Sequence, residues 1–170
     1  TFVVLPPEHP LVHKLLENNP KKAELEAFCE KVRNTSDIER TSTESEKVGM
    51  YTGIDCVHPL TGKSVQIWIT NYVLYDYGTG AVMGVPTGDQ RDWMFATKYN
   101  IPKIITLQPK DHELKLEEMD HAYEDKDGVL VNAGPFTGME MHKAMKAIID
   151  YMEEKGLGKR RVNYRLRDWL

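Results

Sequence analysis

The chain has few cysteines, no long apolar run and no excess of basic residues, and each shortage excludes a class of protein. Its two cysteines, Cys29 and Cys56, are too few for a disulfide framework or a four-cysteine zinc site. No apolar run approaches the roughly 20 residues that a membrane-spanning helix needs. A formal net charge of −4 and a pI near 5.9 differ from the basic field of a general nucleic-acid-binding domain. We therefore expect a single domain of 170 residues in a reducing compartment, the cytoplasm or an organelle matrix, with no membrane partner.

The sequence also lacks the common catalytic and ligand-binding motifs. It contains no G-x-S-x-G serine turn, and neither cysteine lies in a nucleophile motif. Its six histidines have no metal-ligand spacing. The glycines of Gly78-Thr79-Gly80 precede a predicted strand, whereas a phosphate-binding loop leads into a helix. We expect no metal and no cofactor in this domain, and a chemistry that depends on water, substrate groups and oriented hydrogen-bond donors.

Short strands and helices alternate along the chain, without repeats. Period-2 alternation and short apolar runs predict strands, and two of them, around the HPLTGK turn, predict a β-hairpin. The predicted strands are residues 1–5, 54–56, 65–69, 73–74, 81–85, 101–107 and 128–131. Apolar residues spaced three and four apart predict helices. The predicted helices are residues 11–16, 20–32, a helix that begins near Asp89, and 141–152, while 34–47 is expected to be a loop or a frayed helix.

These elements predict an α+β fold, mainly β, with a barrel-like sheet and peripheral helices. The strands are too short and too irregularly connected for a doubly wound parallel sheet. Cys29 lies on the apolar face of its helix and is expected in the core. The apolar face of the last helix, with Met141, Met145 and Met152, is also expected to pack in the core, and Gly156 should end that helix.

Acidic residues stand where a strand leads into a helix, in the segment YGTGAVMGVPTGDQRDWMFATKY (77–99). One interpretation is ordinary capping, in which Asp89 caps the helix and Asp92 pairs with a neighbouring basic side chain. The other is a polar ligand site that includes Asp89, Arg91 and Asp92. The residues alone leave both interpretations open. The basic stretch GKRRVNYRLRDWL is similarly either a solvated chain end or a phosphate contact.

The segment 77–99 resembles the editing domain, also called connective polypeptide 1, of leucyl-tRNA synthetases. The family pattern reads approximately Y-G-T-G-A-V-M-x-V-P-x-H-D-x-R-D. Further similar stretches are PEHPL, RNT, TG at 52–53, HPLTGK, NAGPFTGM and VNYRLRDWL. The chain resembles the bacterial and organellar leucyl type more than the valyl and isoleucyl synthetases, as judged from Met83, the Q-R-D-W run and NYRLRDW.

The resemblance implies post-transfer editing, the hydrolysis of the ester that joins a wrong amino acid, such as norvaline or isoleucine, to tRNA(Leu). One methyl group changes the free energy of binding by only about 1–3 kcal/mol, so one binding site cannot discriminate well enough. A second site, called the second sieve, must remove the wrong amino acids by hydrolysis. The implied partners are the 3′ end of tRNA(Leu) and the synthetic core of the same polypeptide, and ATP and Mg are used only in that core. The alternatives are a valyl or isoleucyl editing domain, a free-standing deacylase, or a decayed tRNA-binding domain without catalysis.

The resemblance also assigns roles to single residues. Asp92 corresponds to the aspartate that holds the α-ammonium group of the substrate. Asp89 is implied to support it through hydrogen bonds, and Arg91 to orient the two acids. No residue is an evident general base, so a water molecule positioned by backbone groups and a ribose hydroxyl is expected to attack. The residues implied to bind the substrate are Tyr77, Met83, Val85, Arg91 and Asp92.

Two departures from the family pattern limit the transfer of these roles. Gly88 stands where the family has histidine just before the first acid. The threonine-rich segment that blocks leucine is expected immediately before Thr1, because TSTES at 41–45 is in the wrong place. We therefore expect residues 1–170 to be one editing domain cut from a larger synthetase, poorly active alone, with 159–170 as a hinge to the synthetic core.

Overall fold

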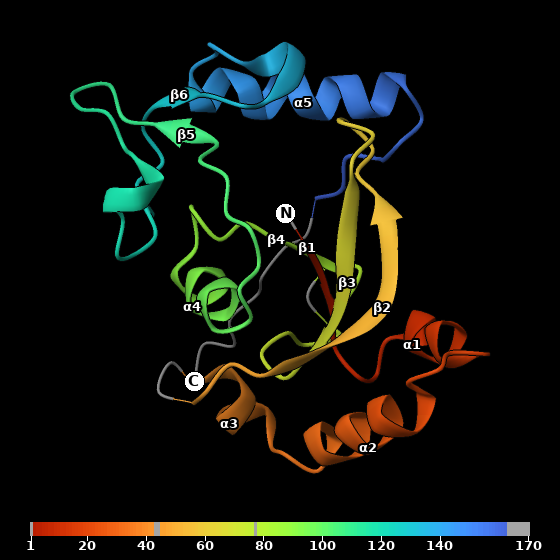
Figure 1. Ribbon diagram of the computed structural model, residues 1–170. Coiled ribbons are helices and arrows are strands. Elements are labelled where there is room, and N and C mark those ends of the chain that lie inside the picture. Colours follow the sequence, from red (N-terminus) through yellow and green to blue (C-terminus); the bar gives the residue numbers. More distant parts are fainter. Residues whose placement is uncertain (1, 43–44, 77, 163–170) are drawn as a thin grey trace, which may run out of the picture.

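Figure 1 shows the computed structural model, which describes residues 2–42, 45–76 and 78–162. The helices are α1 (Pro10–Leu16), α2 (Lys22–Arg33), α3 (Asp37–Thr41), α4 (Gln90–Lys98) and α5 (Met141–Glu154). The strands are β1 (Phe2–Leu5), β2 (Gly49–Val57), β3 (Ser64–Thr70), β4 (Val82–Gly84), β5 (Leu107–Gln108) and β6 (Val129–Leu130). Two short 3-10 turns, η1 (Leu116–Glu118) and η2 (Gly134–Phe136), lie in the second half of the chain.

The main sheet has four strands in the order β2-β3-β1-β4. β1 runs parallel to β3 and antiparallel to β4, so Phe2 lies between Gln66 and Gly84. β2 and β3 form the expected antiparallel hairpin, whose turn spans 58–63 and whose tip reaches α5 in Figure 1. A mixed sheet of this kind excludes a doubly wound parallel arrangement, as the sequence predicted.

The α+β class is confirmed, but the sheet of the described residues is open. Its edge strands, β2 and β4, do not pair with each other, so the sheet does not close into a barrel. The predicted strand at 101–107 is also mostly irregular, and only its end pairs with β6, in a separate two-stranded sheet. Among the described residues more belong to helices than to strands, so the expected emphasis on β structure was too strong.

One local prediction fails, and of the two alternatives for 34–47, a loop or a frayed helix, the structure shows a short helix. Residues 73–74 are not a strand, because the carbonyl of Val73 accepts a hydrogen bond from the Arg40 side chain rather than from a neighbouring strand. The stretch 34–47 contains α3, which begins with a capping box between Ser36 and Glu39. That serine–glutamate spacing is a recognised helix start and was visible in the sequence.

The core lies on both faces of the main sheet. Successive side chains of a strand point to opposite faces, and on β1 Phe2 and Val4 pack toward α4 while Leu5 packs toward α1 and α2. Figure 1 shows α4 on one side of the sheet, away from α1 and α2. Cys29, as expected, is part of the core on the α1–α2 side.

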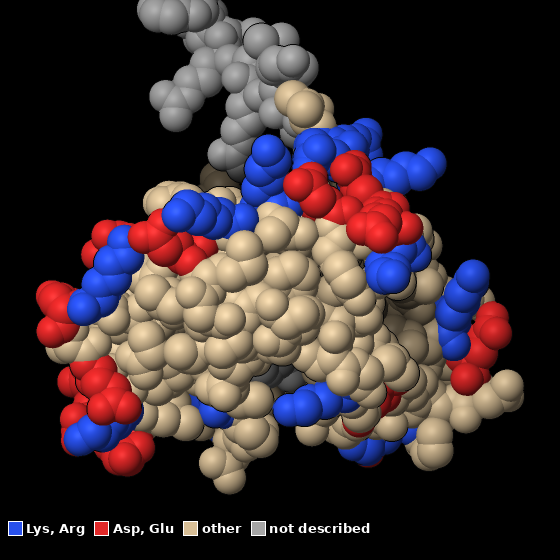
Figure 2. All heavy atoms as spheres, turned by 90° about the horizontal axis from the view of Figure 1, so that it is seen from above, with Lys and Arg blue, Asp and Glu red and all other residues tan. Residues whose placement is uncertain are grey.

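The last helix, α5, forms a smaller layer with β6 and η2. Ala144 is fully buried there with Leu130 and Phe136, and the tip residue Leu60 of the hairpin packs against them. Met145 of the predicted core face is exposed instead, because this helix covers only a two-stranded sheet. Figure 2 shows this end of the molecule as a broad surface without charged side chains at its centre, bordered by charged ones. Gly156, with φ of 67°, ends the helix as predicted.

A glycine on β4 is required by the core beneath it. A Cβ atom on Gly84 would lie 2.4 Å from Cζ of Phe2, a fully buried ring that has no room to move away. We expect Gly84→Ala to lower the free energy of unfolding by about 1–3 kcal/mol, as overpacking does, in urea denaturation of the chain. Gly88→Ala is the control, since its Cβ would meet only the Val85 carbonyl at 3.8 Å. Equal stability of the two variants would contradict this packing.

Candidate active site

The acids of the segment 77–99 meet at the first turn of α4. Asp89 is the N-cap residue, and its Oδ1 accepts hydrogen bonds from the backbone N–H groups of Arg91 (2.9 Å) and Asp92 (3.2 Å). The Arg91 guanidinium lies 3.6 Å from the other oxygen of Asp89. The capping interpretation is therefore confirmed for Asp89, whose carboxylate satisfies N–H groups that have no partner within the helix.

Asp92 makes a different set of contacts from the ones that capping predicts. Its side chain is only 7% exposed. Oδ1 accepts a hydrogen bond from the Tyr72 hydroxyl at 3.0 Å, and Oδ2 accepts one from the Val85 backbone N–H at 2.9 Å. Both donors are neutral, so the interpretation in which Asp92 pairs with a basic side chain is wrong. The two bonds join α4, the end of β4 and the segment after β3.

Burial shifts the pKa values of Asp92 and Tyr72. It raises the pKa of Asp92, Asp89 raises it further, and the bonds from Val85 and Tyr72 and the charge of Arg91 oppose the rise. Burial and the neighbouring Asp92 carboxylate also raise the pKa of Tyr72 far above that of a free phenol. Tyr72 therefore remains a hydrogen-bond donor, and a positive ligand group beside Asp92 would favour the ionised carboxylate.

The raised pKa of Asp92 predicts a pH-dependent stability difference. Between the ordinary carboxyl pKa and the raised one, the folded state binds more protons than the unfolded state, so stability falls as pH rises through the raised pKa. Asp92→Asn does not titrate. We therefore expect the stability advantage of the unmodified chain over Asp92→Asn to grow as pH falls through this window. Urea unfolding of both proteins at a series of pH values measures it, and a pH-independent difference would contradict the raised pKa.

The strand before α4 presents apolar side chains beside the two acids. Met83 and Val85 lie two residues apart and are 53% and 44% exposed, while Gly84 between them faces the core. The Val85 backbone is joined to Asp92 by the hydrogen bond described above. The structure thus brings together Val85, Asp89, Arg91 and Asp92, with Met83 farther along β4; Tyr77 lies outside the described residues.

Tyr72 is the residue of this site that the sequence did not reveal. It precedes Asp92 by 20 positions, and no local pattern connects a tyrosine after one strand with an acid after another.

Contacts from a distant part of the chain also support the start of α4. The Gln90 N–H donates to Glu124 at 3.0 Å, and the Gln90 side-chain oxygen accepts from the N–H of Ala122 at 2.8 Å. The segment after η1 therefore stabilises the first turn of α4 through hydrogen bonds from outside the helix.

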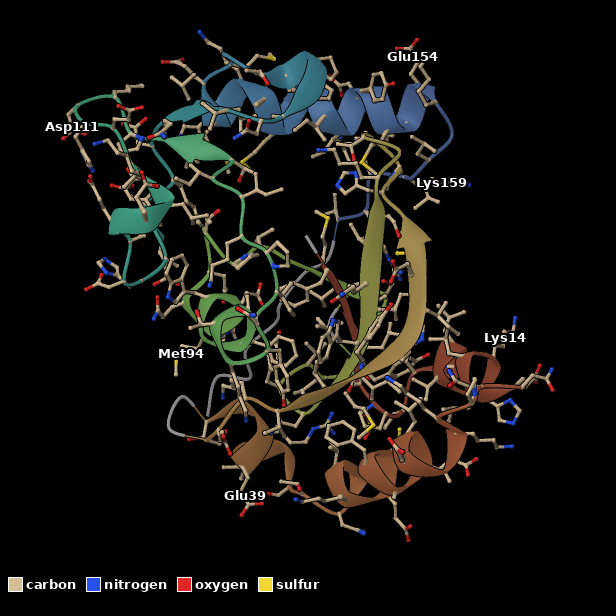
Figure 3. All side chains as sticks on the ribbon, in the orientation of Figure 1. Lys14, Glu39, Met94, Asp111, Glu154 and Lys159 are labelled. Carbon is tan, nitrogen blue, oxygen red and sulfur yellow. The ribbon has the colours of Figure 1, made fainter. Side chains whose placement is uncertain are left out.

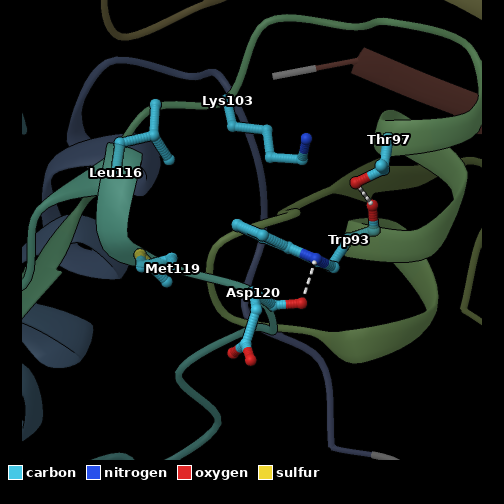
Figure 4. Close-up of a pocket in the computed structure, with 6 residues that line it drawn as sticks. All are labelled: Trp93, Thr97, Lys103, Leu116, Met119 and Asp120. Carbon is cyan, nitrogen blue, oxygen red and sulfur yellow. Dashed lines mark hydrogen bonds between the residues drawn. The ribbon is translucent and has the colours of Figure 1, made fainter.

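Two cavities lie near α4 and α1, and neither Asp89 nor Asp92 lines either of them. The larger, of about 320 Å³, lies between α4 and the segment that contains η1, and Figure 4 shows Lys103 pointing across it. The Lys103 ammonium is 4.7 Å from the centroid of the Trp93 ring, and the Trp93 indole donates to the Asp120 carbonyl at 3.1 Å. The second cavity, of about 280 Å³, lies beside α1 and α2 and includes Cys29 in its lining.

The described part of the chain has neither a cluster of metal ligands nor a helix that could span a membrane. Within 2–42, 45–76 and 78–162 no group of three or more His, Cys, Asp or Glu side chains could hold a metal ion. Over the same ranges, no helix has the length and apolar character needed to cross a membrane. The two cysteines, Cys29 and Cys56, are both free.

Comparison with known proteins identifies the family. Residues 1–153 match the protein family described as leucyl-tRNA synthetase, editing domain. The chain belongs to this family. Leucine–tRNA ligases from Symbiobacterium thermophilum and Thermotoga maritima are 49% and 47% identical to it over its whole length. The leucyl editing family and its bacterial type, rather than the valyl or isoleucyl type, are thus confirmed.

A solved structure agrees with the family. The LeuRS of Agrobacterium radiobacter K84, in a ternary complex described as LeuRS-tRNA-LeuAMS, matches 99% of this chain with a TM-score of 0.69 and 29% identity. The chain covers 17% of that protein and 20% of each leucine–tRNA ligase named above. It therefore spans about a fifth of the length of its relatives.

Proposed function

We propose that this editing domain hydrolyses the ester between tRNA(Leu) and a non-cognate amino acid, as part of a leucyl-tRNA synthetase. The observation that carries the proposal is the match to the editing-domain family over residues 1–153. The neighbouring LeuRS was solved with tRNA, which supports tRNA as the partner. The names of the bacterial relatives support an enzyme that also ligates leucine to tRNA(Leu). We further propose that it is cytoplasmic, that ATP and Mg are used only in its synthetic core, and that this domain uses no cofactor.

In this proposal Asp92 binds the α-ammonium group of the misacylated residue. The carboxylate is buried, and each of its oxygens accepts one hydrogen bond from the protein. A carboxylate oxygen accepts more than one bond, so a charge-assisted bond from an ammonium group adds to the existing pair. Asp89 and Arg91 hold the helix start to which Asp92 belongs.

The exposed apolar residues would form the part of the site that contacts the amino acid and the terminal adenosine. Met83 and Val85 present their side chains to solvent beside the acids. The proposed nucleophile is a water molecule held by backbone groups and a ribose hydroxyl, so correct positioning supplies much of the rate. Gly88, where the family has histidine, leaves room for a side chain, so its effect is the loss of an imidazole and not a change in packing.

Deacylation assays of the full-length synthetase test this function. We expect hydrolysis of norvalyl- and isoleucyl-tRNA(Leu) and much slower hydrolysis of leucyl-tRNA(Leu), because leucine must survive the second sieve. A synthetase that hydrolyses none of the three would show that the domain has lost editing and only contacts tRNA. Equal hydrolysis of all three would contradict the proposed sieve.

We also propose that residues 159–170 are a hinge to the synthetic core rather than a surface that binds tRNA. The Arg160 guanidinium is bound back to α5, 2.5 Å from Asp150 and 3.4 Å from Glu153. We expect the double substitution of Arg160 and Arg161 by alanine to change the coupling of editing to charging and to leave tRNA affinity within about two-fold. Filter binding at several salt concentrations measures the affinity. A lower salt slope, by about one per lost contact, would instead indicate direct phosphate contacts.

A further inference from the structure

An ion pair between the buried Arg40 and the more exposed Glu8 lies behind the segment that carries Tyr72. Arg40 of α3 is 4% exposed and donates to both carboxylate oxygens of Glu8, at 3.1 and 3.3 Å. The same guanidinium donates to the backbone carbonyls of Asn71 (3.1 Å) and Val73 (2.9 Å). A planar guanidinium with several fixed donors suits this arrangement, whereas a lysine ammonium cannot reproduce it.

The two carbonyls held by Arg40 flank Tyr72. This stretch does not pair as a strand, so the Arg40 bonds take the place of a strand neighbour there. The Tyr72 ring is buried in the core, with its centroid 5.4 Å from that of Phe95. Its hydroxyl emerges at Asp92, 3.0 Å from Oδ1. A continuous set of contacts thus runs from Glu8 through Arg40 and Tyr72 to the carboxylate of the proposed site.

The carboxylate is fixed from two directions. The Tyr72 hydroxyl binds one oxygen and the Val85 N–H binds the other, so together they set the rotation of the carboxylate plane. The charged and titratable groups that face Asp92 are Asp89 and Arg91 from its own helix and Tyr72 from the segment after β3. Without the phenol only the bond from the Val85 N–H remains, and one bond restrains the last torsion of the carboxylate, which is a broad one, less than two do.

We propose that Tyr72, held in place by the Arg40–Glu8 pair, is a positioning residue that orients the Asp92 carboxylate toward the substrate ammonium group. This inference rests on the proposed editing function and deepens it. The two parts of the Tyr72 side chain have separate roles: the hydroxyl donates the hydrogen bond to Asp92, and the ring packs in the core beside Phe95. A substitution that removes only the hydroxyl therefore tests the positioning role.

Tyr72→Phe separates the two contributions. In the full-length synthetase we expect kcat/KM for norvalyl-tRNA(Leu) hydrolysis to fall roughly ten-fold or more, the range for a hydrogen bond to a charged group. The bond from Tyr72 also lowers the pKa of Asp92. Its loss should therefore move the acidic limb of the pH–rate profile to higher pH, which a loss of stability alone would not do.

Tyr99→Phe is the matched control. Tyr99 belongs to the same aromatic cluster, with its ring centroid 4.7 Å from that of Phe95, and its hydroxyl accepts from the Gly49 N–H at 3.0 Å, away from Asp92. We expect this variant to edit with an unchanged rate and pH profile. The inference is overturned if Tyr72→Phe edits like Tyr99→Phe in both respects while the unmodified enzyme edits.

A second pair of variants tests the support behind Tyr72. Arg40→Lys should produce the same shift of the pH–rate profile, whereas Arg33→Lys, which loses only the contact to the Pro7 carbonyl (2.6 Å), should not. Thermal unfolding shows whether Arg40→Lys remains folded, and if it does not, the Tyr72→Phe and Tyr99→Phe pair decides. An unmodified synthetase without any deacylation would contradict the proposed function itself, an outcome distinct from normal editing by Tyr72→Phe.

Discussion

Replacement of Asp92 by alanine is expected to abolish editing of mischarged tRNA(Leu) by the full-length synthetase. The substitution removes the only group proposed to neutralise the substrate ammonium, and an unpaired charge in a buried site costs about 1–3 kcal/mol or more. Deacylation of norvalyl-tRNA(Leu) measures the effect, and leucine activation by the same preparation shows that the synthetic core is intact. Undiminished editing would disprove the assignment of Asp92.

The structure adds a consequence for stability that the sequence did not predict. Asp92→Ala leaves the Tyr72 hydroxyl and the Val85 N–H without their acceptor, and each unsatisfied buried donor costs about 1–3 kcal/mol. Asp92→Asn keeps the shape and one acceptor, and it should lose editing with a smaller loss of stability. Asp55→Asn is the control, since Asp55 also accepts a tyrosine hydroxyl, from Tyr51 at 2.6 Å, on the exposed hairpin.

Phe95→Ala is expected to cause a large loss of stability in this domain. Phe95 is fully buried on α4, and its ring contacts those of Phe2, Trp68, Tyr72 and Tyr99. Removal of a buried phenylalanine ring leaves a cavity and costs about 3–5 kcal/mol. For a chain of this size the melting temperature should fall by roughly 10 °C, and urea denaturation and thermal unfolding measure both quantities.

Met94→Ala is the control on the same helix. Met94 is 53% exposed, and Figure 3 shows its side chain pointing away from the sheet. Its loss should change the free energy of unfolding by less than about 0.5 kcal/mol, the usual range for surface positions. If the two substitutions destabilise the chain equally, α4 does not pack on the sheet through Phe95.

Patterns within a few residues predicted much of the fold. The apolar spacing on α2, the HPLTGK turn between β2 and β3, and Gly156 after α5 each have a local physical cause, and each was confirmed. The prediction failed where a distant group decided the outcome. Residues 73–74 have strand-forming side chains, but the Arg40 guanidinium binds the backbone that a neighbouring strand would otherwise pair with.

The sequence by itself determined the family and the α+β class, and it offered capping as one of two interpretations of Asp89, because each depends on residues close together in the chain or on a resemblance along it. Only the tertiary structure decided that the sheet is open, that Asp92 is buried between Tyr72 and Val85, and that Arg40 lies behind them. The physical reason is that hydrogen bonds and burial between residues 20 or more positions apart depend on how the strands and helices pack. No spacing in the sequence records that packing.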